Sequence, residues 1–177
     1  TILDGVTGVQ TCALPILFGE VAASLAGTVY QDNGTGVAAQ ADNGVKDAGE
    51  VGIANVPITV TGTDLLGNAV SRSTTTDVNG NWQIDGLLAA GLGGYTVTEG
   101  TIPPASGSFI DGRETAGTAG GNTSAVNDRI SAIALGAGQQ ASGYLFGELG
   151  IAPISGTVYI DLNRNTAMDP EIGRAHV

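Results

Sequence analysis

The segment VPITVTGT, from Val56 to Thr63, is the clearest indication of this protein's fold. Apolar β-branched side chains occupy every second position from Val56 to Val60, and proline and threonine stand between them. Successive side chains of a β-strand point to opposite faces. The alternation therefore predicts a strand with one buried face and one face in water.

The same period of two recurs along most of the chain, and no segment carries a sustained apolar stripe at helical spacing. Turn-forming residues separate the runs, at Leu65–Asn68, Asp77–Gly80 and Gly91–Gly94. Short strands at this density are typical of an all-β Greek-key sandwich, in which we expect Trp82 and Tyr95 to be core residues. The predicted strands are Leu25–Gln31, Val56–Thr63, Ala69–Thr76, Asn81–Ile84, Tyr95–Glu99, Ser106–Asp111, Ile130–Leu135 and Ala141–Glu148.

An internal repeat sets the expected domain organisation. LFGE followed by AGTVYQD, at Leu17–Glu20 and Ala26–Asp32, recurs as LFGE followed by SGTVYID, at Leu145–Glu148 and Ser155–Asp161. This tandem pattern predicts one complete unit over 24–148, the end of a preceding unit and a linker over 17–23, and a linker with the first strand and acidic loop of a following unit over 149–170.

The two ends of the chain differ from the rest. One codon choice for EIGRAHV, residues 171–177, gives a DNA whose opposite strand, shifted by one base, encodes TCALPI, residues 11–16. Unrelated protein ends are not expected to be reverse complements, so both are interpreted as translated sequencing adapter. We therefore exclude 1–16 and 171–177 from the fold prediction, and with them Cys12 and His176, the only cysteine and histidine.

The charge balance limits the classes of function. The chain carries a formal net charge of −11, with 17 acidic and 6 basic residues. Binding to a nucleic-acid backbone needs a basic patch that this composition does not supply, so no nucleic-acid partner is expected. No apolar run is long enough to insert into a membrane. The acidity favours a secreted or surface protein, or one that collects divalent cations.

Seven motifs in order resemble the B-type repeats of serine–aspartate-repeat (Sdr) bacterial surface adhesins, within the collagen-adhesin B-type sandwich group. The motifs are GTVYQD, DNGVKDAGEVGI, VPITVTGTDLLGNAV, TTTDVNGNWQIDGL, GYTVTEG, DGRETAGTAGG and ISAIALGAGQQASGYLFGEL. The resemblance covers residues 24–148 and restarts at Ser155. It implies an extracellular, cell-wall-linked stalk of repeats that calcium rigidifies and that projects an adhesive region.

Calcium would bind the acidic loops that follow each GTVY motif. Asp and Asn oxygens at close spacing are hard ligands that suit Ca²⁺. The resemblance points to Asp47 and Glu50, whereas an insertion over about 34–41 leaves open which of Asp32, Asn33, Asp42 and Asn43 coordinate. The loop of the following unit offers Asp161, Asn163, Asn165 and Asp169, with Thr166 where the family has glycine. Ordinary acidic turns are the alternative, because Asp, Asn and Gly are also turn formers.

Other acidic residues are weaker candidates. Asp77 and Asn79 are expected to form a hairpin turn, and Asp111 and Glu114 are possible additional ligands. Related domains carry a Lys–Asn isopeptide bond beside a buried acid, the place of Glu99 in YTVTE, but the only lysine is Lys46, in the acidic loop. We expect no isopeptide bond. Without histidine or cysteine in 17–170, nucleophilic catalysis has no support, so the chain is predicted not to be an enzyme.

The sequence therefore predicts a calcium-stiffened spacer repeat of a bacterial surface adhesin. Its partners would be neighbouring repeats of the same chain, with host or matrix proteins contacted through other domains. One alternative is a module that itself contacts a matrix or host ligand, for instance by strand addition at a sheet edge. Another is an accessory domain of a large secreted polysaccharide-acting protein.

Overall fold

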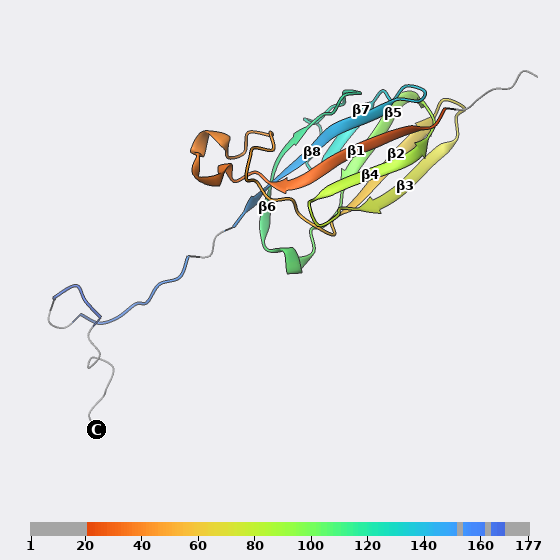
Figure 1. Ribbon diagram of the computed structural model, residues 1–177. Coiled ribbons are helices and arrows are strands. Elements are labelled where there is room, and N and C mark those ends of the chain that lie inside the picture. Colours follow the sequence, from red (N-terminus) through yellow and green to blue (C-terminus); the bar gives the residue numbers. More distant parts are fainter. Residues whose placement is uncertain (1–20, 152–153, 162–163, 169–177) are drawn as a thin grey trace, which may run out of the picture.

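The predicted all-β sandwich is confirmed. The computed structural model describes residues 21–151, 154–161 and 164–168, and places eight strands in two four-stranded sheets, ordered β4-β1-β8-β6 and β3-β2-β5-β7 (Figure 1). Two of the three short 3₁₀ segments, Gly34–Gly36 and Ala38–Gln40, lie between β1 and β2, and the third is Pro104–Ser106. The strands are β1 Ala23–Gln31, β2 Pro57–Asp64, β3 Ala69–Thr75, β4 Asn81–Leu87, β5 Ala90–Glu99, β6 Phe109–Thr115, β7 Arg129–Ile133 and β8 Gln140–Gly150.

The first and last strands are parallel neighbours in the middle of one sheet. Their register runs from Ser24 opposite Gln140 to Gln31 opposite Glu148, whereas all the other strand pairs are antiparallel. Because β1 and β8 point the same way, the chain enters the sandwich at one end and leaves it at the other (Figure 1). The loop after β1 consequently lies at the end where β8 leaves.

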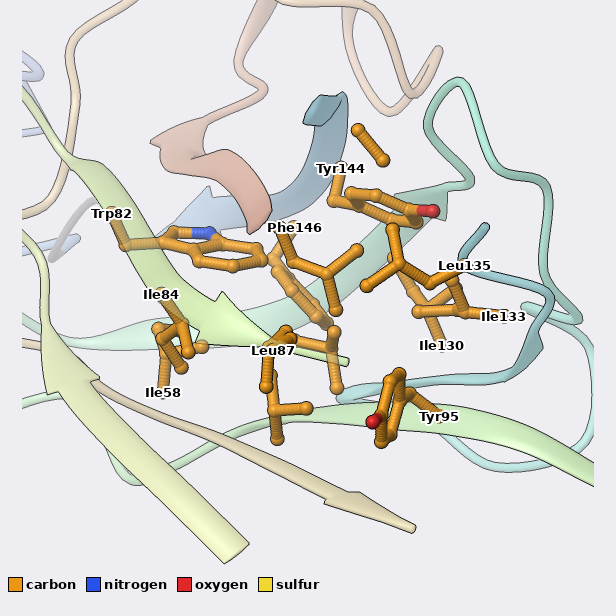
Figure 2. Packing of buried hydrophobic residues seen from close by; sticks show 14 of the residues in the cluster. Ile58, Trp82, Ile84, Leu87, Tyr95, Ile130, Ile133, Leu135, Tyr144 and Phe146 are labelled. Atoms are coloured by element: carbon orange, nitrogen blue, oxygen red, sulfur yellow. The ribbon is translucent and has the colours of Figure 1, made fainter. Parts of the chain in front are cut away.

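The core lies between the two sheets and follows the predicted alternation. Ile58 and Val60 of β2 are fully buried, whereas Thr61 is exposed. Trp82 and Tyr95 are both core residues, as expected, and the Trp82 ring packs against Tyr144 with centroids 6.4 Å apart (Figure 2). Burial of these large rings contributes much of the hydrophobic stabilisation of such a domain.

Gly27 of the GTVY motif is required by packing and not by a turn. A Cβ built on it would meet the backbone oxygen of Tyr144 and lie 2.7 Å from Trp82 Cζ2. Gly156, the matching glycine of the second copy of the motif, has nothing within 4 Å of such a Cβ. The same residue in the same motif is therefore under different constraints in the two places.

Local predictions were wrong at two segments rich in glycine or proline. Gly91–Gly94, predicted as a turn, lies inside β5, where Gly93 and Gly94 have positive φ angles of 99° and 72° and the register with β2 shifts. Glycine tolerates these angles, so a bulge forms within the strand and does not end it. The strand predicted at Ser106–Asp111 begins only at Phe109 and continues to Thr115, because Pro104–Ser106 forms a 3₁₀ turn first.

The second copy of the motif stands apart from the sheets. Residues 154–161 form no strand in the described structure, and the Ile154 and Val158 side chains are fully exposed. Leu149 and Gly150, expected to belong to the linker, instead extend β8. The predictions for residues 1–16 and 171–177, and for Asn163 and Asp169, concern positions outside the described residues.

Candidate metal centre

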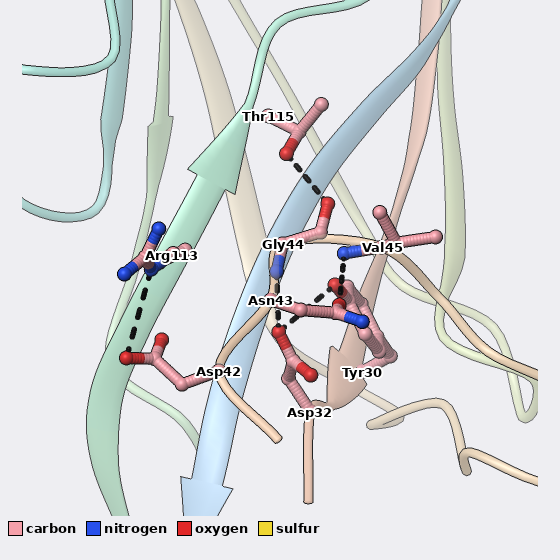
Figure 3. A network of polar contacts seen from close by, with 8 residues as sticks. All are labelled: Tyr30, Asp32, Asp42, Asn43, Gly44, Val45, Arg113 and Thr115. Atoms are coloured by element: carbon pink, nitrogen blue, oxygen red, sulfur yellow. Dashed lines mark hydrogen bonds and ion pairs between the residues drawn. The ribbon is translucent and has the colours of Figure 1, made fainter. Parts of the chain in front are cut away.

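The acidic loop that connects β1 to β2 covers one end of β1. Tyr30 is fully buried, yet it does not belong to the core cluster between the sheets. It lies beneath the loop instead, beside Asp32 and Asn43 (Figure 3). Burial, and next the negative charge of Asp32, raise the pKa of the Tyr30 hydroxyl above its ordinary value. The loop therefore covers the Tyr30 side chain at the end of β1.

Asp32 is the most deeply buried of the predicted ligands, with no exposed surface. Its Oδ2 atom accepts hydrogen bonds from the Gly44 amide at 2.8 Å and the Tyr30 hydroxyl at 3.4 Å (Figure 3). Its Oδ1 atom is buried and has no hydrogen-bond partner among the described residues. A buried carboxylate oxygen without a donor is costly unless a proton or a cation satisfies it.

Glu50, Asp47 and Asn43 hold the loop together. The Glu50 side chain accepts from the Gly34 amide at 2.9 Å and from the Asp47 amide at 2.8 Å. Asn43 donates its side-chain amide to Asp47 Oδ2 at 2.9 Å and accepts from the Val45 amide at 2.7 Å. Both Glu50 oxygens therefore bind backbone amides, and a cation would have to share or displace these donors.

Asp42 faces away from the other ligands, towards β6. Its Oδ2 atom lies 3.7 Å from Arg113 Nε (Figure 3), whereas its buried Oδ1 has no hydrogen-bond partner within the described ranges. Lys46 donates to the Glu50 carbonyl at 3.0 Å. The structure thus gathers Asp32, Asn43, Asp47 and Glu50 in one loop and places Asp42 at its margin. That the five residues coordinate an ion stays a prediction.

The second acidic loop is turn-like where the structure describes it. Asp161 accepts from the Asn165 amide at 3.1 Å and from the Thr166 amide at 2.8 Å. The Asn165 side chain accepts from the Ala167 amide at 2.9 Å. The expected hairpin turn at Asp77 is also present, with the Asn79 and Asn81 amides donating to Asp77 Oδ1.

A separate group of acids brings residues of the two sheets together at the same end of the molecule, with Glu99 and Glu148 buried and Asp111 and Asp128 more exposed. Glu99 ends β5, Glu148 lies near the end of β8, and Asp128 directly precedes β7. One carboxylate oxygen from each lies within 4.8 Å of the others. Asp111, Glu114 and Asp128 form a second such group. We call these five residues the carboxylate cluster; its geometry can hold a metal ion.

Backbone contacts position the carboxylate cluster. The Glu99 amide donates to the Asp128 carbonyl at 2.9 Å, and the Asp128 amide donates to Glu114 Oε1 at 2.6 Å. Asp111 of β6 lies opposite Glu148 of β8 in the antiparallel register. The acids are therefore brought together by the ends of β5 and β8, by β6 and by the loop before β7, and not by a contiguous motif.

The cluster is electrostatically strained without a counter-ion. Burial first, and then the charges of Glu148 and Asp128, raise the pKa of Glu99 to about 9. Burial, followed by Asp128 and Asp111, raises the pKa of Glu148 to about 8. Burial and a hydrogen bond with Asp128 raise the pKa of Asp111 to about 6. Proximity of like charges disfavours ionisation, and a cation among them would reverse these shifts.

Sequence reasoning did not single out Asp128 or Glu148, and it gave Glu99, Asp111 and Glu114 only minor roles. The sequence did indicate that Glu148 would be buried, because it stands two positions after Phe146 on β8 and so shares the core-facing side of that strand. No local pattern predicted Asp128 as a member of the cluster, because it reaches the other acids only through the folding of the loop before β7.

Comparisons with known proteins add little to this geometry. No protein-family model matches the chain, and no curated protein matches it. Among solved structures, the chain has a likeness to the crystal structure of the major plantain pollen allergen Pla l 1, with 11% identity and a TM-score of 0.38. The match covers 75% of this chain and 98% of the allergen. A likeness this weak carries no argument about function.

Proposed function

We propose that this chain is a calcium-stiffened spacer repeat of a bacterial cell-surface adhesin, which holds an adhesive region away from the cell. The observation that carries the proposal is the parallel pairing of β1 with β8. It makes the chain enter and leave at opposite ends of the sandwich, which is the geometry that end-to-end stacking of repeats needs. A neighbouring repeat would then continue the array from residue 151 onward.

The same pairing suits a repeat that bears force. Tension applied through the two ends of the unit pulls β1 and β8 in opposite directions along their length. Their hydrogen bonds, spread from Ser24 to Gln31 on β1, are then loaded together in shear and not opened one after another. A spacer that resists extension is the expected result.

Calcium binding is proposed at the β1–β2 loop. The loop is acidic, and the buried Oδ1 atoms of Asp32 and Asp42 have no hydrogen-bond donor in the described part of the chain. Oxygen-only ligands of this kind suit Ca²⁺. The loop begins where β8 ends, because the Asp32 amide donates to the Glu148 carbonyl at 2.8 Å. An ion bound there would stiffen the junction through which the next repeat is attached.

The internal repeat of LFGE and GTVY and the ordered resemblance to Sdr B-type repeats also support this proposal. They favour a location outside the cell, with neighbouring repeats as direct partners. The described residues contain no helix with the length and hydropathy that crossing a membrane requires.

Single-molecule force spectroscopy tests the proposal. The chain, held at positions 21 and 151, should unfold in one cooperative step, and the unfolding force should be higher in calcium than in chelator. A chain held at Ala23 and Leu87 is the matched control, because these residues lie opposite each other on antiparallel β1 and β4 and this geometry opens the pair from one end. Equal unfolding forces in the two pulling directions would contradict a spacer adapted to tension.

A further inference from the structure

The carboxylate cluster has an arrangement that neither the acidic loop nor the spacer role explains. We propose that Glu99, Asp128 and Glu148 form a second divalent-cation site, separate from the β1–β2 loop, in which a hard cation such as Ca²⁺ joins the two sheets of the sandwich. The proposal does not depend on the loop site or on the spacer function.

The first argument is convergence. One oxygen from each of the three carboxylates lies within 4.8 Å of the other two. Calcium binds oxygen at about 2.3–2.6 Å, so ligands around one ion are separated by up to roughly 5 Å. The three oxygens can therefore surround one ion without a change in the backbone segments that carry them.

The second argument is an oxygen that lacks a partner. Glu99 is only 5% exposed, and its Oε2 atom is buried with no hydrogen-bond donor in the described ranges. Buried polar atoms are nearly always hydrogen-bonded in folded proteins, so each exception needs an explanation. Here the oxygen belongs to the residue that reaches towards Asp128 and Glu148, and a cation at their centre would satisfy it.

The third argument concerns the supply of positive charge. The cluster borders a cavity of about 620 Å³, and no lysine, arginine or histidine is among the described residues that line it. Arg113, on the same strand as Asp111 and Glu114, lies beside Asp42 instead. Lys46 is bonded to the Glu50 carbonyl in the loop. No ion pair between a basic side chain and the cluster is present among the described residues, so an ion from solution would supply the missing positive charge.

The cavity also provides room for the rest of a coordination shell. Ca²⁺ takes six to eight oxygen ligands and accepts water among them. Asp128 is the most exposed of the three acids, and all three line the cavity. Glu99 and Glu148 would thus supply the buried ligands, and Asp128 and water the outer ones.

The position of the site gives it a structural consequence. Glu99 belongs to the sheet of β2, β3, β5 and β7, and Glu148 belongs to the other sheet. An ion bound by both would link the sheets at the end where β8 leaves the sandwich. It would also hold the loop before β7, which carries Asp128, against the end of β5.

Calorimetric titration of the cation-free chain with Ca²⁺ tests the proposal. The Glu99→Gln/Glu148→Gln chain keeps the shape of both side chains and should bind one Ca²⁺ fewer than the unchanged chain. Asp47→Asn/Glu50→Gln, which alters only the loop, should keep this site. Asp85→Asn removes an exposed carboxylate whose hydrogen bond comes from Gln83, and serves as the control for general loss of charge. An unchanged stoichiometry and affinity in Glu99→Gln/Glu148→Gln would overturn the proposal.

A second measurement needs no variant and so does not depend on whether a substituted chain folds. The backbone amides of Gly100, Arg129 and Leu149 directly follow the three proposed ligands. Their NMR resonances should shift on addition of Ca²⁺ to the unchanged chain, and the shifts should persist in Asp47→Asn/Glu50→Gln. If calcium shifts only the resonances of residues 32–50, the cluster is not a cation site, and the loop site stands alone.

Discussion

The Asp32 amide donates a 2.8 Å hydrogen bond to the Glu148 carbonyl, and this contact joins the start of the β1–β2 loop to a residue of the carboxylate cluster. The Asp32 side chain lies under the β1–β2 loop with Tyr30, whereas the Glu148 side chain lies between the sheets with Glu99. Both acids therefore occupy the end at which β8 leaves the sandwich. Ions bound on either side of this contact would act on the same junction.

Calcium should raise the melting temperature of the chain, and loss of the loop acids should remove part of that rise. A ligand that binds only the folded state adds about 2.7 kcal/mol to the free energy of unfolding when its free concentration is about a hundred times Kd. Thermal melting in calcium and in chelator measures the gain, which should be smaller in Asp47→Ala and Glu50→Ala. Asp85→Ala, outside both acidic regions, should keep the full gain. Equal melting temperatures with and without calcium in the unchanged chain would leave the loop as an ordinary acidic turn.

The cation-free chain should lose stability as pH rises from the ordinary glutamate value of 4.5 towards about 9. The folded pKa values of Glu99 and Glu148, about 9 and about 8, exceed the unfolded value, so the folded state holds more protons across this range. Unfolding then releases protons, and the free energy of unfolding falls with pH. The pKa values of Asp64 and Asp77 are lowered from 3.8. These two residues therefore change the free energy of unfolding only at lower pH, where they make it rise with pH.

Urea unfolding in chelator at several pH values checks this dependence. Glu99→Gln should flatten the curve, and it should be more stable than the unchanged chain at the upper end of the range. Asp85→Asn should follow the unchanged chain. A stability that rises between neutral pH and pH 9 in the unchanged chain would show that the cluster is not strained in the cation-free state.

Gly27→Ala should destabilise the sandwich strongly, whereas Gly156→Ala should not. The added methyl group of Gly27→Ala would meet the Tyr144 backbone and the Trp82 ring, and overpacking against backbone costs about 2 kcal/mol or more. At Gly156 nothing lies within 4 Å, so we expect a change within about 0.5 kcal/mol. Chemical denaturation of the two variants measures the difference. Similar losses at both positions would mean that the second copy of the motif is packed in solution.

The intact mass of the folded chain should equal the mass calculated from its sequence. Lys46 lies in the acidic loop, where its amine donates to the Glu50 carbonyl, and it does not enter the core beside Glu99. A Lys–Asn isopeptide bond releases one ammonia, which mass spectrometry resolves readily. A mass deficit of that size, mapped to a peptide containing Lys46, would refute the prediction.

Much of the fold could be predicted from local patterns. The alternation in Val56–Thr63 and its counterparts located all eight strands, although the bounds of β6 were displaced, because a half-buried strand repeats every two residues. The errors came at glycine- and proline-containing segments, because such segments are compatible with more than one local structure. Gly91–Gly94 could end a strand or bulge within one, and only pairing with β2 and β7 decided between them.

The acidic loop and the carboxylate cluster show the limit of the sequence most clearly. By itself the sequence determined the β-sandwich, the repeated GTVY motif and the concentration of acids after β1, since each is a pattern among near neighbours in the chain. Only the tertiary structure decided that Glu99, Asp128 and Glu148 meet. They come from two sheets and a loop, and their convergence depends on long-range strand pairing that no local spacing encodes. The parallel contact of β1 with β8, which sends the two ends of the unit in opposite directions, was likewise a result of folding.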